Sequence, residues 1–252
     1  MALTQRQNDI YNFLKKKKYC KINEISKQVF CSDATTRREL NELSKLGLIE
    51  RNHGGAVLLQ NPEELSIFIR AAKNVKEKEA IAKYASSYIP SFKTAFIDNS
   101  SSAMSIIKYI YLKKKTIVTN SLVLAMELSK IENISVFVPS GYISSNNNTV
   151  IGNSTIKNIE KLHFDLFISS CTSISKDGTF ESSEEQASVK TAVLERSSVK
   201  ILLVDETKFM NESTYLTAKL SEYDYCFTNA SIDIVNKFKK LGLNIIKIDM
   251  EK

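Results

Sequence analysis

The sequence predicts two domains of different fold class: a small α+β domain at the amino terminus and a larger α/β domain with a mainly parallel sheet. Within residues 1–58, three short helical patterns precede two strand-like runs around a glycine pair. Strand-like and helical patterns then alternate over residues 76–252. The mixed segment between them, residues 59–75, contains Asn61-Pro62 and is expected to be a linker.

The charge distribution also distinguishes the two predicted domains. The 252 residues carry a net charge of +7, and residues 1–58 hold 11 Lys and Arg against 6 Asp and Glu. A concentrated basic segment attracts polyanions, and nucleic acid is the commonest such partner. The lysine run at 15–18 is, by itself, more simply explained as a solvated surface.

Three helices are predicted in the small domain: one capped by Thr4, one over residues 22–30, and one that begins after Ser32 and ends near Gly47. The apolar positions recur every three or four residues: Ile10, Phe13 and Leu14, then Ile22, Ile25 and Val29, then Leu40, Leu43 and Leu46. This order is that of a helix-turn-helix. We expect its third helix to expose Thr35, Thr36, Arg37 and Arg38, where such a helix meets base edges and phosphates in the major groove.

A hairpin follows the third helix. Residues 48–51 and 56–58 read as two short strands around Asn52-His53-Gly54-Gly55. Paired glycines allow a tight turn, and Arg51 and His53 can reach a sugar-phosphate backbone. A β-wing beside a basic helix makes the winged helix-turn-helix arrangement.

The residues of this domain resemble those of the DeoR family of bacterial transcriptional regulators. The resemblance rests on Ser32-x-x-Thr35-x-Arg37-Arg38-Glu39-Leu40 and, after Leu43 and Gly47, on Arg51-x-His53-Gly54-Gly55-Ala56. It implies double-stranded operator DNA as a partner, and Thr36 stands where the family often has a hydrophobic residue. The implied DNA-binding residues are Ser32, Asp33, Thr35, Thr36, Arg37, Arg38, Arg51, His53, Gly54 and Gly55.

Polar residues follow the predicted strands of the larger domain. The strands are expected at residues 94–98, 116–119, 134–139, 165–170, 199–204, 225–228 and 244–248, and helices at 76–88, 103–111, 121–130, 185–197 and 232–241. Ligands of open α/β sheets bind outside the carboxyl ends of the strands. The Ser-rich turn at 98–102 opens a helix there, which suits a phosphate.

The larger domain resembles, more weakly, the sensor domain of the same regulators, whose fold is related to sugar-phosphate isomerases and which senses phosphorylated sugars. The implied effector-binding residues are Asp98, Ser100, Ser101, Ser102, Thr119, Asn120, Gly141, Gly152, Lys190, Asp205 and Lys208. Three departures from the family pattern bear on the ligand: Ser100 replaces a Gly, Ser140 replaces the first Gly of a pair, and Ser188 replaces a Glu.

The resemblance implies a repressor of a sugar uptake or catabolism operon that a phosphorylated sugar releases from DNA. Two alternatives stay open: a sensor domain that serves oligomerisation only, and a sugar-phosphate isomerase-like enzyme. An isomerase needs a positioned general base, and Asp98 and Glu184 are weak candidates with no His nearby. We therefore expect no enzyme activity and no catalytic residue.

Cofactors, metals and membranes are not expected. The four cysteines lack C-x-x-C spacing and read as reduced thiols of a cytoplasmic protein, and the two histidines lie far apart. No apolar run is long enough to cross a bilayer. A homo-oligomer, dimer or tetramer, is expected because symmetric half-sites match a two-fold protein.

Overall fold

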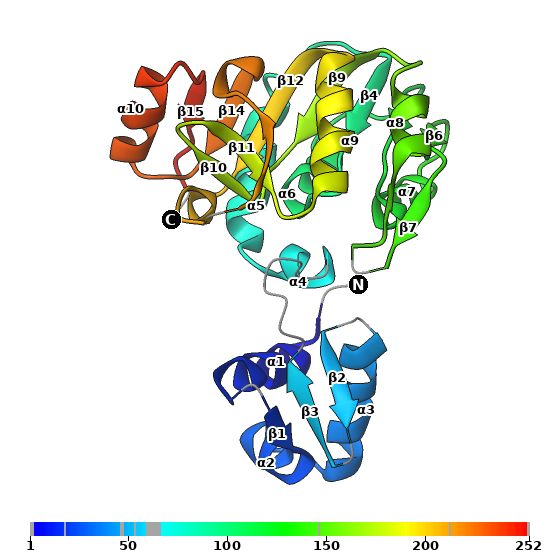
Figure 1. Ribbon diagram of the computed structural model, residues 1–252, viewed down its shortest axis with the longest axis vertical. Coiled ribbons are helices and arrows are strands. Elements are labelled where there is room, and N and C mark those ends of the chain that lie inside the picture. The colour runs from blue at the N-terminus through cyan, green and yellow to red at the C-terminus, as the bar shows by residue number, and fades with distance from the viewer. Residues whose placement is uncertain are drawn as a thin grey trace. The chain divides into compact units, whose positions relative to one another are not determined.

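The structure is a computed structural model that describes residues 3–17, 19–45, 48–52, 54–58, 67–145, 147–211 and 213–250. The chain forms two compact units, Met1–Lys73 and Asn74–Lys252 (Figure 1). His53, Leu46 and Gly47, which the sequence analysis singles out, lie outside the described residues.

The first unit contains the three predicted helices, α1 (Gln5–Lys17), α2 (Ile22–Gln28) and α3 (Asp33–Lys45). Thr4 caps α1 as expected, because the backbone N–H of Gln7 donates to Thr4 Oγ1 at 3.2 Å. Ile10, Leu14, Leu40 and Leu43 are fully buried in one core cluster, so the helical spacing is confirmed for them. The second helix ends two residues earlier than predicted, which leaves Val29 and Phe30 in the turn.

A three-stranded antiparallel sheet completes this unit, in the order β1 (Tyr19–Lys21), β3 (Gly55–Leu58), β2 (Ile49–Asn52). The predicted hairpin is β2 and β3, which pair from Ile49–Leu58 to Asn52–Gly55. Strand β1 is not predicted, and it pairs with β3 from the side opposite β2. The segment predicted as a linker contains a short helix, α4 (Ile67–Ala72).

The second unit is built on a sheet of seven parallel strands, all of them predicted. In spatial order they are β15 (Ile245–Lys247), β14 (Tyr225–Thr228), β12 (Ser197–Val204), β9 (Phe164–Ser169), β4 (Thr94–Ile97), β5 (Thr116–Val118) and β6 (Ser135–Phe137). Strands β4, β9 and β12 lie in the middle of the sheet. Their later residues are buried on both faces, which explains the apolar runs Ala95–Ile97, Leu166–Ile168 and Ile201–Val204.

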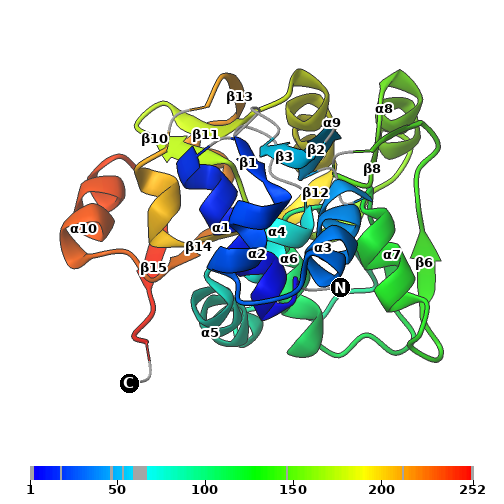
Figure 2. The same ribbon diagram turned by 90° about the horizontal axis from the view of Figure 1, so that it is seen from below.

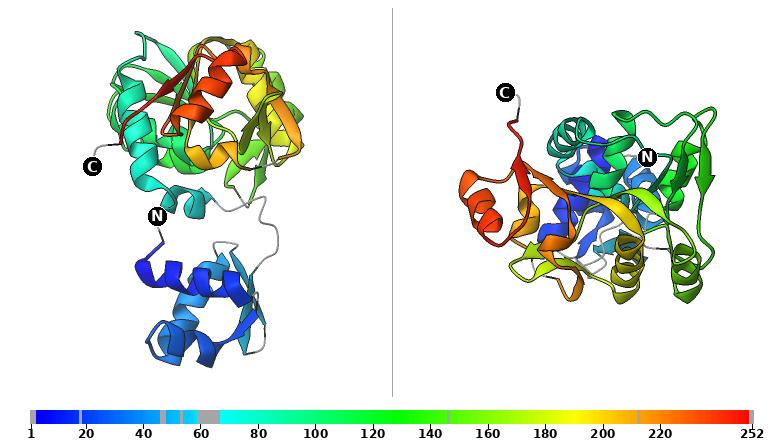
Figure 3. Two further views of the ribbon diagram at one scale, coloured as in Figure 1. Left: turned by 90° about the vertical axis from the view of Figure 1, so that its left-hand side faces the viewer. Right: turned by 90° about the horizontal axis from the view of Figure 1, so that it is seen from above.

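Helices cover both faces of this sheet, with α8 and α9 on one side and α5 on the other (Figures 2 and 3). One face packs on α5 (Val75–Ser86), α6 (Ser101–Met104), the 3₁₀ helix η2 (Ser105–Lys108) and α7 (Leu122–Leu128). The other packs on α8 (Asn153–Ile159), α9 (Glu184–Glu195) and α10 (Ile232–Lys240). Strand side chains alternate between the two cores: Phe96 enters one, and Ala95 and Ile97 enter the other.

Several elements of the second unit are not predicted. They are α8, the hairpin β7 (Tyr142–Ser144) and β8 (Thr149–Ile151), the antiparallel sheet of β10 (Ser173–Ser175), β11 (Gly178–Glu181) and β13 (Tyr215–Ala218), and the 3₁₀ helices η3 (Glu206–Phe209) and η4 (Leu220–Glu222). The helix predicted at 103–111 is instead the short pair α6 and η2.

Among the described residues, no helix is long and apolar enough to cross a membrane. Within the same part of the chain, no cluster of three or more His, Cys, Asp or Glu could hold a metal ion.

Candidate functional site

The amino-terminal end of α3 presents polar groups to solvent. Ser32 precedes the helix and caps it, since the Thr35 backbone N–H donates to Ser32 Oγ at 3.2 Å. Ser32 and Asp33 are exposed and Thr35 is half-buried, with the two hydroxyl oxygens of Ser32 and Thr35 3.0 Å apart. A helix start of this kind offers hydroxyls and backbone N–H groups to an anion.

Arg37 and Arg38 follow on the exposed side of α3. Within the described part of the chain, neither guanidinium pairs with a carboxylate. The adjacent Glu39 is turned toward α1, where Arg6 contacts its Oε1 at 3.5 Å and Gln7 Nε2 donates to its Oε2 at 2.9 Å. Both guanidinium groups are therefore available to an external partner.

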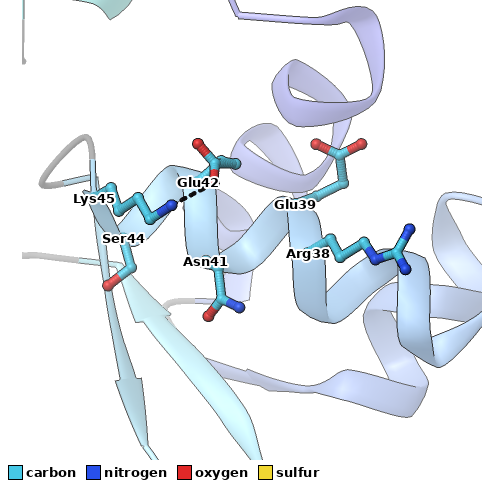
Figure 4. A pocket seen from close by; sticks show the side chains of 6 residues that line it. All are labelled: Arg38, Glu39, Asn41, Glu42, Ser44 and Lys45. Carbon is cyan, nitrogen blue, oxygen red and sulfur yellow. Dashed lines mark hydrogen bonds and ion pairs between the residues drawn. The ribbon is translucent and has the colours of Figure 1, made fainter.

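A surface hollow runs along α3 from Arg38 to Lys45 (Figure 4). Its other lining residues are Glu39, Asn41, Glu42 and Ser44. Lys45 Nζ contacts Glu42 Oε1 at 2.8 Å, so the positive charge at this end of the hollow is already compensated. The uncompensated charge lies at the amino-terminal half of the helix.

Thr36 is a correction to the sequence analysis, which expects it to be exposed. Its side chain is fully buried, and its Oγ1 donates to the carbonyl of Ser32 at 3.1 Å. The reason is helical spacing: position 36 lies one turn before Leu40 and two before Leu43, on the buried stripe of α3. A buried hydroxyl cannot contact DNA, so Thr36 leaves the set of candidate contacts.

The hairpin is attached to α3 through Arg51. Its Nη1 donates to Asn41 Oδ1, and its buried Nε has no hydrogen-bond partner among the described residues. Gly54, at the exposed tip, adopts a φ of +92°, which favours glycine. Gly55 is buried, and a Cβ there would lie 2.5 Å from the carbonyl oxygen of Cys20 in β1. Close strand pairing explains this glycine without any DNA contact, so the structure adds no support for Gly55 as a DNA-binding residue.

Asp98 is the centre of a polar cluster in the second unit, directly after β4. Its Oδ1 accepts from the Ser100 N–H at 2.8 Å, and its Oδ2 accepts from Ser169 Oγ at 2.7 Å and the Ser170 N–H at 3.2 Å. The side chain is 1% exposed. Burial by itself would raise the pKa of Asp98, but the charge of Lys190 and the hydrogen bonds from Ser100 and Ser169 hold it below its ordinary value.

Lys190, on α9, joins two buried carboxylates. Its Nζ lies 3.0 Å from Asp98 Oδ2, contacts Glu181 Oε1 and donates to the carbonyl of Ser170 at 2.7 Å. Burial alone would lower the pKa of Lys190, and the charges of Asp98 and Glu181 raise it above its ordinary range instead. The structure therefore brings together two of the predicted effector-binding residues, Asp98 and Lys190, and each is already paired inside the protein. Sequence reasoning missed Glu181.

The serines after Asp98 are buried and mostly serve the local fold. Ser100 caps α6, because the Ala103 N–H donates to its Oγ at 3.2 Å. Ser101 and Ser102 lie in the first turn and are 9% and 3% exposed. The predicted Ser-rich turn therefore exists at the carboxyl end of β4, beside the Asp98 cluster.

Two buried polar atoms near the strand ends lack partners among the described residues, Asn120 Oδ1 after β5 and Ser170 Oγ after β9. Asn120 is tied to β8, since its carbonyl accepts from the Val150 N–H at 2.7 Å. Thr119 accepts from the Ser121 N–H at 3.1 Å and is fully buried. Buried oxygens of this kind are usually paired with protein, water or a ligand.

Asp205 and Lys208 follow β12. Asp205 Oδ1 caps η3 by accepting from the Thr207 N–H at 3.1 Å, and it also accepts from Asn74 Nδ2 at 3.3 Å. Lys208 is half-buried on η3. Burial and the charge of Glu181 raise the pKa of Cys171 to about 12, while Lys208 and Lys190 act in the opposite direction. Lys208 thus lies within electrostatic range of the thiol that follows Ser170.

The two predicted effector glycines have structural explanations. A Cβ at Gly141 would lie 2.2 Å from Thr155 Oγ1 and 2.6 Å from the carbonyl oxygen of Ile151. Gly152 adopts a φ of +106° at the start of α8. Close packing and backbone conformation explain both glycines without any ligand, and their contact with an effector stays a prediction.

Comparison with known proteins matches both units. A family model described as the DeoR-like helix-turn-helix domain covers residues 6–61, and one described as the DeoR C terminal sensor domain covers residues 73–230. The chain is 31% identical to the HTH-type transcriptional regulator GolR of Listeria innocua over 246 residues, which are 96% of this chain and 97% of that protein.

Further relatives include the glycerol-3-phosphate regulon repressor of Escherichia coli, 31% identical over 91% of this chain and 92% of that protein. The HTH-type transcriptional repressor GlcR of Bacillus subtilis is 28% identical over 91% and 89%. Among solved structures, ribose 5 phosphate isomerase A from Neisseria gonorrhoeae matches with a TM-score of 0.38 and 15% identity, over 52% of each chain.

Proposed function

The chain belongs to the DeoR family of transcriptional regulators, and from that membership we propose that it represses an operon for sugar uptake or catabolism. Two of its relatives are named as repressors, one of them of a glycerol-3-phosphate regulon. The first unit would bind operator DNA, and a phosphorylated sugar bound to the second unit would release it. The relatives are regulators and not enzymes by name, which supports the absence of a catalytic role.

The observation that carries operator binding is on the exposed face of α3, where Arg37 and Arg38 form no ion pair with any described residue. Arg can bind guanine bidentately in the major groove or neutralise a phosphate. The proposed contacts are the predicted ones without Thr36 and Gly55, namely Ser32, Asp33, Thr35, Arg37, Arg38, Arg51, His53 and Gly54.

The test is DNA binding by the full chain with Arg37→Ala and Arg38→Ala, measured by fluorescence anisotropy on a duplex recovered by in vitro selection. Each substitution should cost about 1–3 kcal/mol of binding free energy. Lys45→Ala is the matched control, because Lys45 lies on the same helix and is already paired with Glu42. Arginine variants that bind as tightly as the Lys45 variant would contradict the proposal.

The effector site we propose lies at the strand ends around Asn120 Oδ1, Ser170 Oγ and Lys208. The two buried oxygens can pair with sugar hydroxyls, and the ammonium group of Lys208 can pair with a phosphate. Lys190 is already paired with both Asp98 and Glu181, so the role of this network would be to shape the site. The sugar must bind the arrangement that cannot hold DNA more tightly, because only differential affinity shifts a population.

A thermal-shift screen of phosphorylated hexoses, pentoses and trioses tests the effector site. A specific ligand stabilises the folded chain by about 2.7 kcal/mol at roughly a hundred times its dissociation constant. Lys208→Met should abolish that shift, whereas Lys157→Met, on the exposed side of α8, should keep it. If the whole panel gave no shift, the second unit would be an oligomerisation module, and turnover of the same compounds would indicate an isomerase-like enzyme.

A homo-oligomer, dimer or tetramer, is also part of the proposal, since a two-fold protein matches symmetric half-sites. Sedimentation of the full chain at several concentrations measures it directly.

A further inference from the structure

Phe30 occupies an unusual position in the turn between α2 and α3. Its side chain is 95% exposed, the largest value among the large hydrophobic side chains of the described residues. A single exposed apolar residue needs no explanation. Phe30, however, also adopts a φ of +51°.

A positive φ places the backbone in the left-handed region, where glycine is favoured and asparagine is tolerated. The other non-glycine residues described with positive φ are Asn74, Lys114, Asn133 and Asn148. An aromatic residue is strained in this conformation. Because the Phe30 ring is exposed, it gains no packing energy that would offset the backbone strain. The stability of the fold therefore gives no reason for a phenylalanine here.

The neighbours of Phe30 place it beside the proposed DNA-binding face. A surface hollow is lined by Phe30, Ser26, Lys27, Cys31 and Ser32. The Cys31 N–H donates to the carbonyl of Ser26 at 3.0 Å, which fixes the turn. Lys27 and Ser32 are exposed. The ring thus lines the same hollow as the cap of α3 and as Lys27, which forms no ion pair with any residue that the structure describes.

We propose that Phe30 is a specificity-determining residue that contacts the C5-methyl group of a thymine in the operator, while Lys27 binds the adjacent phosphate. Thymine is the base that presents a methyl group in the major groove, and phenylalanine is one of the side chains that contacts it. The positive charge beside the ring favours duplex DNA over an apolar protein surface as its occupant. This inference rests on the proposed function, operator binding.

The experiment combines a protein change with a DNA change. Wild type and Phe30→Gly are titrated by anisotropy with the selected operator and with copies in which single thymines are replaced by uracil, which lacks the methyl group. At one thymine per half-site, replacement by uracil should lower the affinity of the wild-type protein for the duplex about fourfold, which is the effect of one buried methyl group. The same replacement should leave the affinity of the Phe30→Gly variant unchanged. This variant should bind the thymine-containing operator at least about fourfold more weakly than wild type does.

Misfolding does not confuse this test, because Phe30→Gly relieves a positive φ and should raise the melting temperature. Phe30→Asn, which tolerates the same conformation, should weaken DNA binding equally and shows that added flexibility is not the cause. Tyr111→Ala removes a side chain that is 68% exposed in the second unit and should leave binding unchanged.

The inference is overturned if Phe30→Gly binds the operator as wild type does, or if every uracil weakens both proteins equally. The first result would point to a protein partner for the ring. Failure of the proposed function itself looks different, because wild type would then retain no duplex and Arg37→Ala would change nothing.

Discussion

Replacing Lys190 with methionine removes the cation from the buried network of the second unit. Its Nζ lies 3.0 Å from Asp98 and also contacts Glu181, and the three side chains are 1–5% exposed. Methionine keeps the length of the side chain but leaves two carboxylates buried without a counter-charge. Breaking a buried ion pair in this way costs about 3–5 kcal/mol, because an uncompensated charge stays in the interior.

The loss of stability in Lys190→Met should depend on pH, and the pKa of Asp98 determines in which direction. The pKa of Asp98 is held below its ordinary value: burial would raise it, and Lys190 and the serine hydrogen bonds outweigh that effect. The ionised Asp98 therefore stabilises wild type above the unfolded-state pKa of about 3.9, and this contribution is lost as the pH falls through the folded-state pKa. In Lys190→Met burial dominates and that pKa rises. The deficit of the variant should thus be largest near neutral pH and should shrink as the pH approaches about 4.

The assay is urea unfolding of the full chain followed by circular dichroism, with hydrogen exchange and mass spectrometry on peptides from β4, β9 and β12 to assign the transition to the second unit. Lys157→Met is the matched control, since this lysine is exposed on α8 and should cost less than about 0.5 kcal/mol. Equal losses of stability in the two variants, or a Lys190→Met deficit that grows toward about pH 4, would show that Lys190 does not compensate the buried carboxylates.

Three further substitutions test other parts of the account. Thr36→Val should cost about 1 kcal/mol of stability, because the hydroxyl loses its hydrogen bond to the Ser32 carbonyl and its contact with Cys31 Sγ. It should leave operator affinity unchanged, and a large loss of affinity with an intact fold would restore Thr36 as a DNA contact. Leu40→Ala should destabilise the first unit by about 2–5 kcal/mol in thermal unfolding, since Leu40 is fully buried, and a loss below about 1 kcal/mol would disagree with the core assignment. Gly141→Ala should destabilise the second unit by about 1–3 kcal/mol, measured by urea unfolding, because the new Cβ meets Thr155; wild-type stability would show that this contact relaxes freely.

Most of the regular structure could be predicted from periodicity. Strand β9 contains the apolar run Leu166–Ile168 and strand β12 the apolar run Ile201–Val204. Helix α3 carries Leu40 and Leu43 at helical spacing. These patterns are local, so they can be recognised in the sequence without knowing which other elements each helix or strand contacts.

The elements that could not be predicted are short and depend on distant pairing. Strand β10 is three residues, Ser173–Ser175, with one apolar side chain, and its sheet is completed by β13 from much later in the chain. Strand β1 is equally short and exists because Gly55 lets β3 approach Cys20 closely. A sequence of three residues contains no information about the distant strand with which it pairs.

The candidate sites follow the same division. Arg37 and Arg38 could be placed on the outer face of α3, and the same helical spacing contained the signal that Thr36 is buried. Lys190 and Glu181 are residue types that are seldom buried. Lys190 pairs with both Glu181 and Asp98, and these contacts join α9, β11 and the end of β4, which are far apart in the sequence. Composition and residue spacing therefore could not predict these contacts of Lys190.

The most direct test of the central claim is an anisotropy titration of the full chain with the selected duplex, repeated in the presence of each phosphorylated sugar of the screen. We expect saturable binding that weakens steeply with salt, and release of the duplex by at least one sugar phosphate that also raises the melting temperature. If selection from a random duplex library at low salt recovered no bound DNA, the assignment of this chain as an operator-binding repressor would be contradicted.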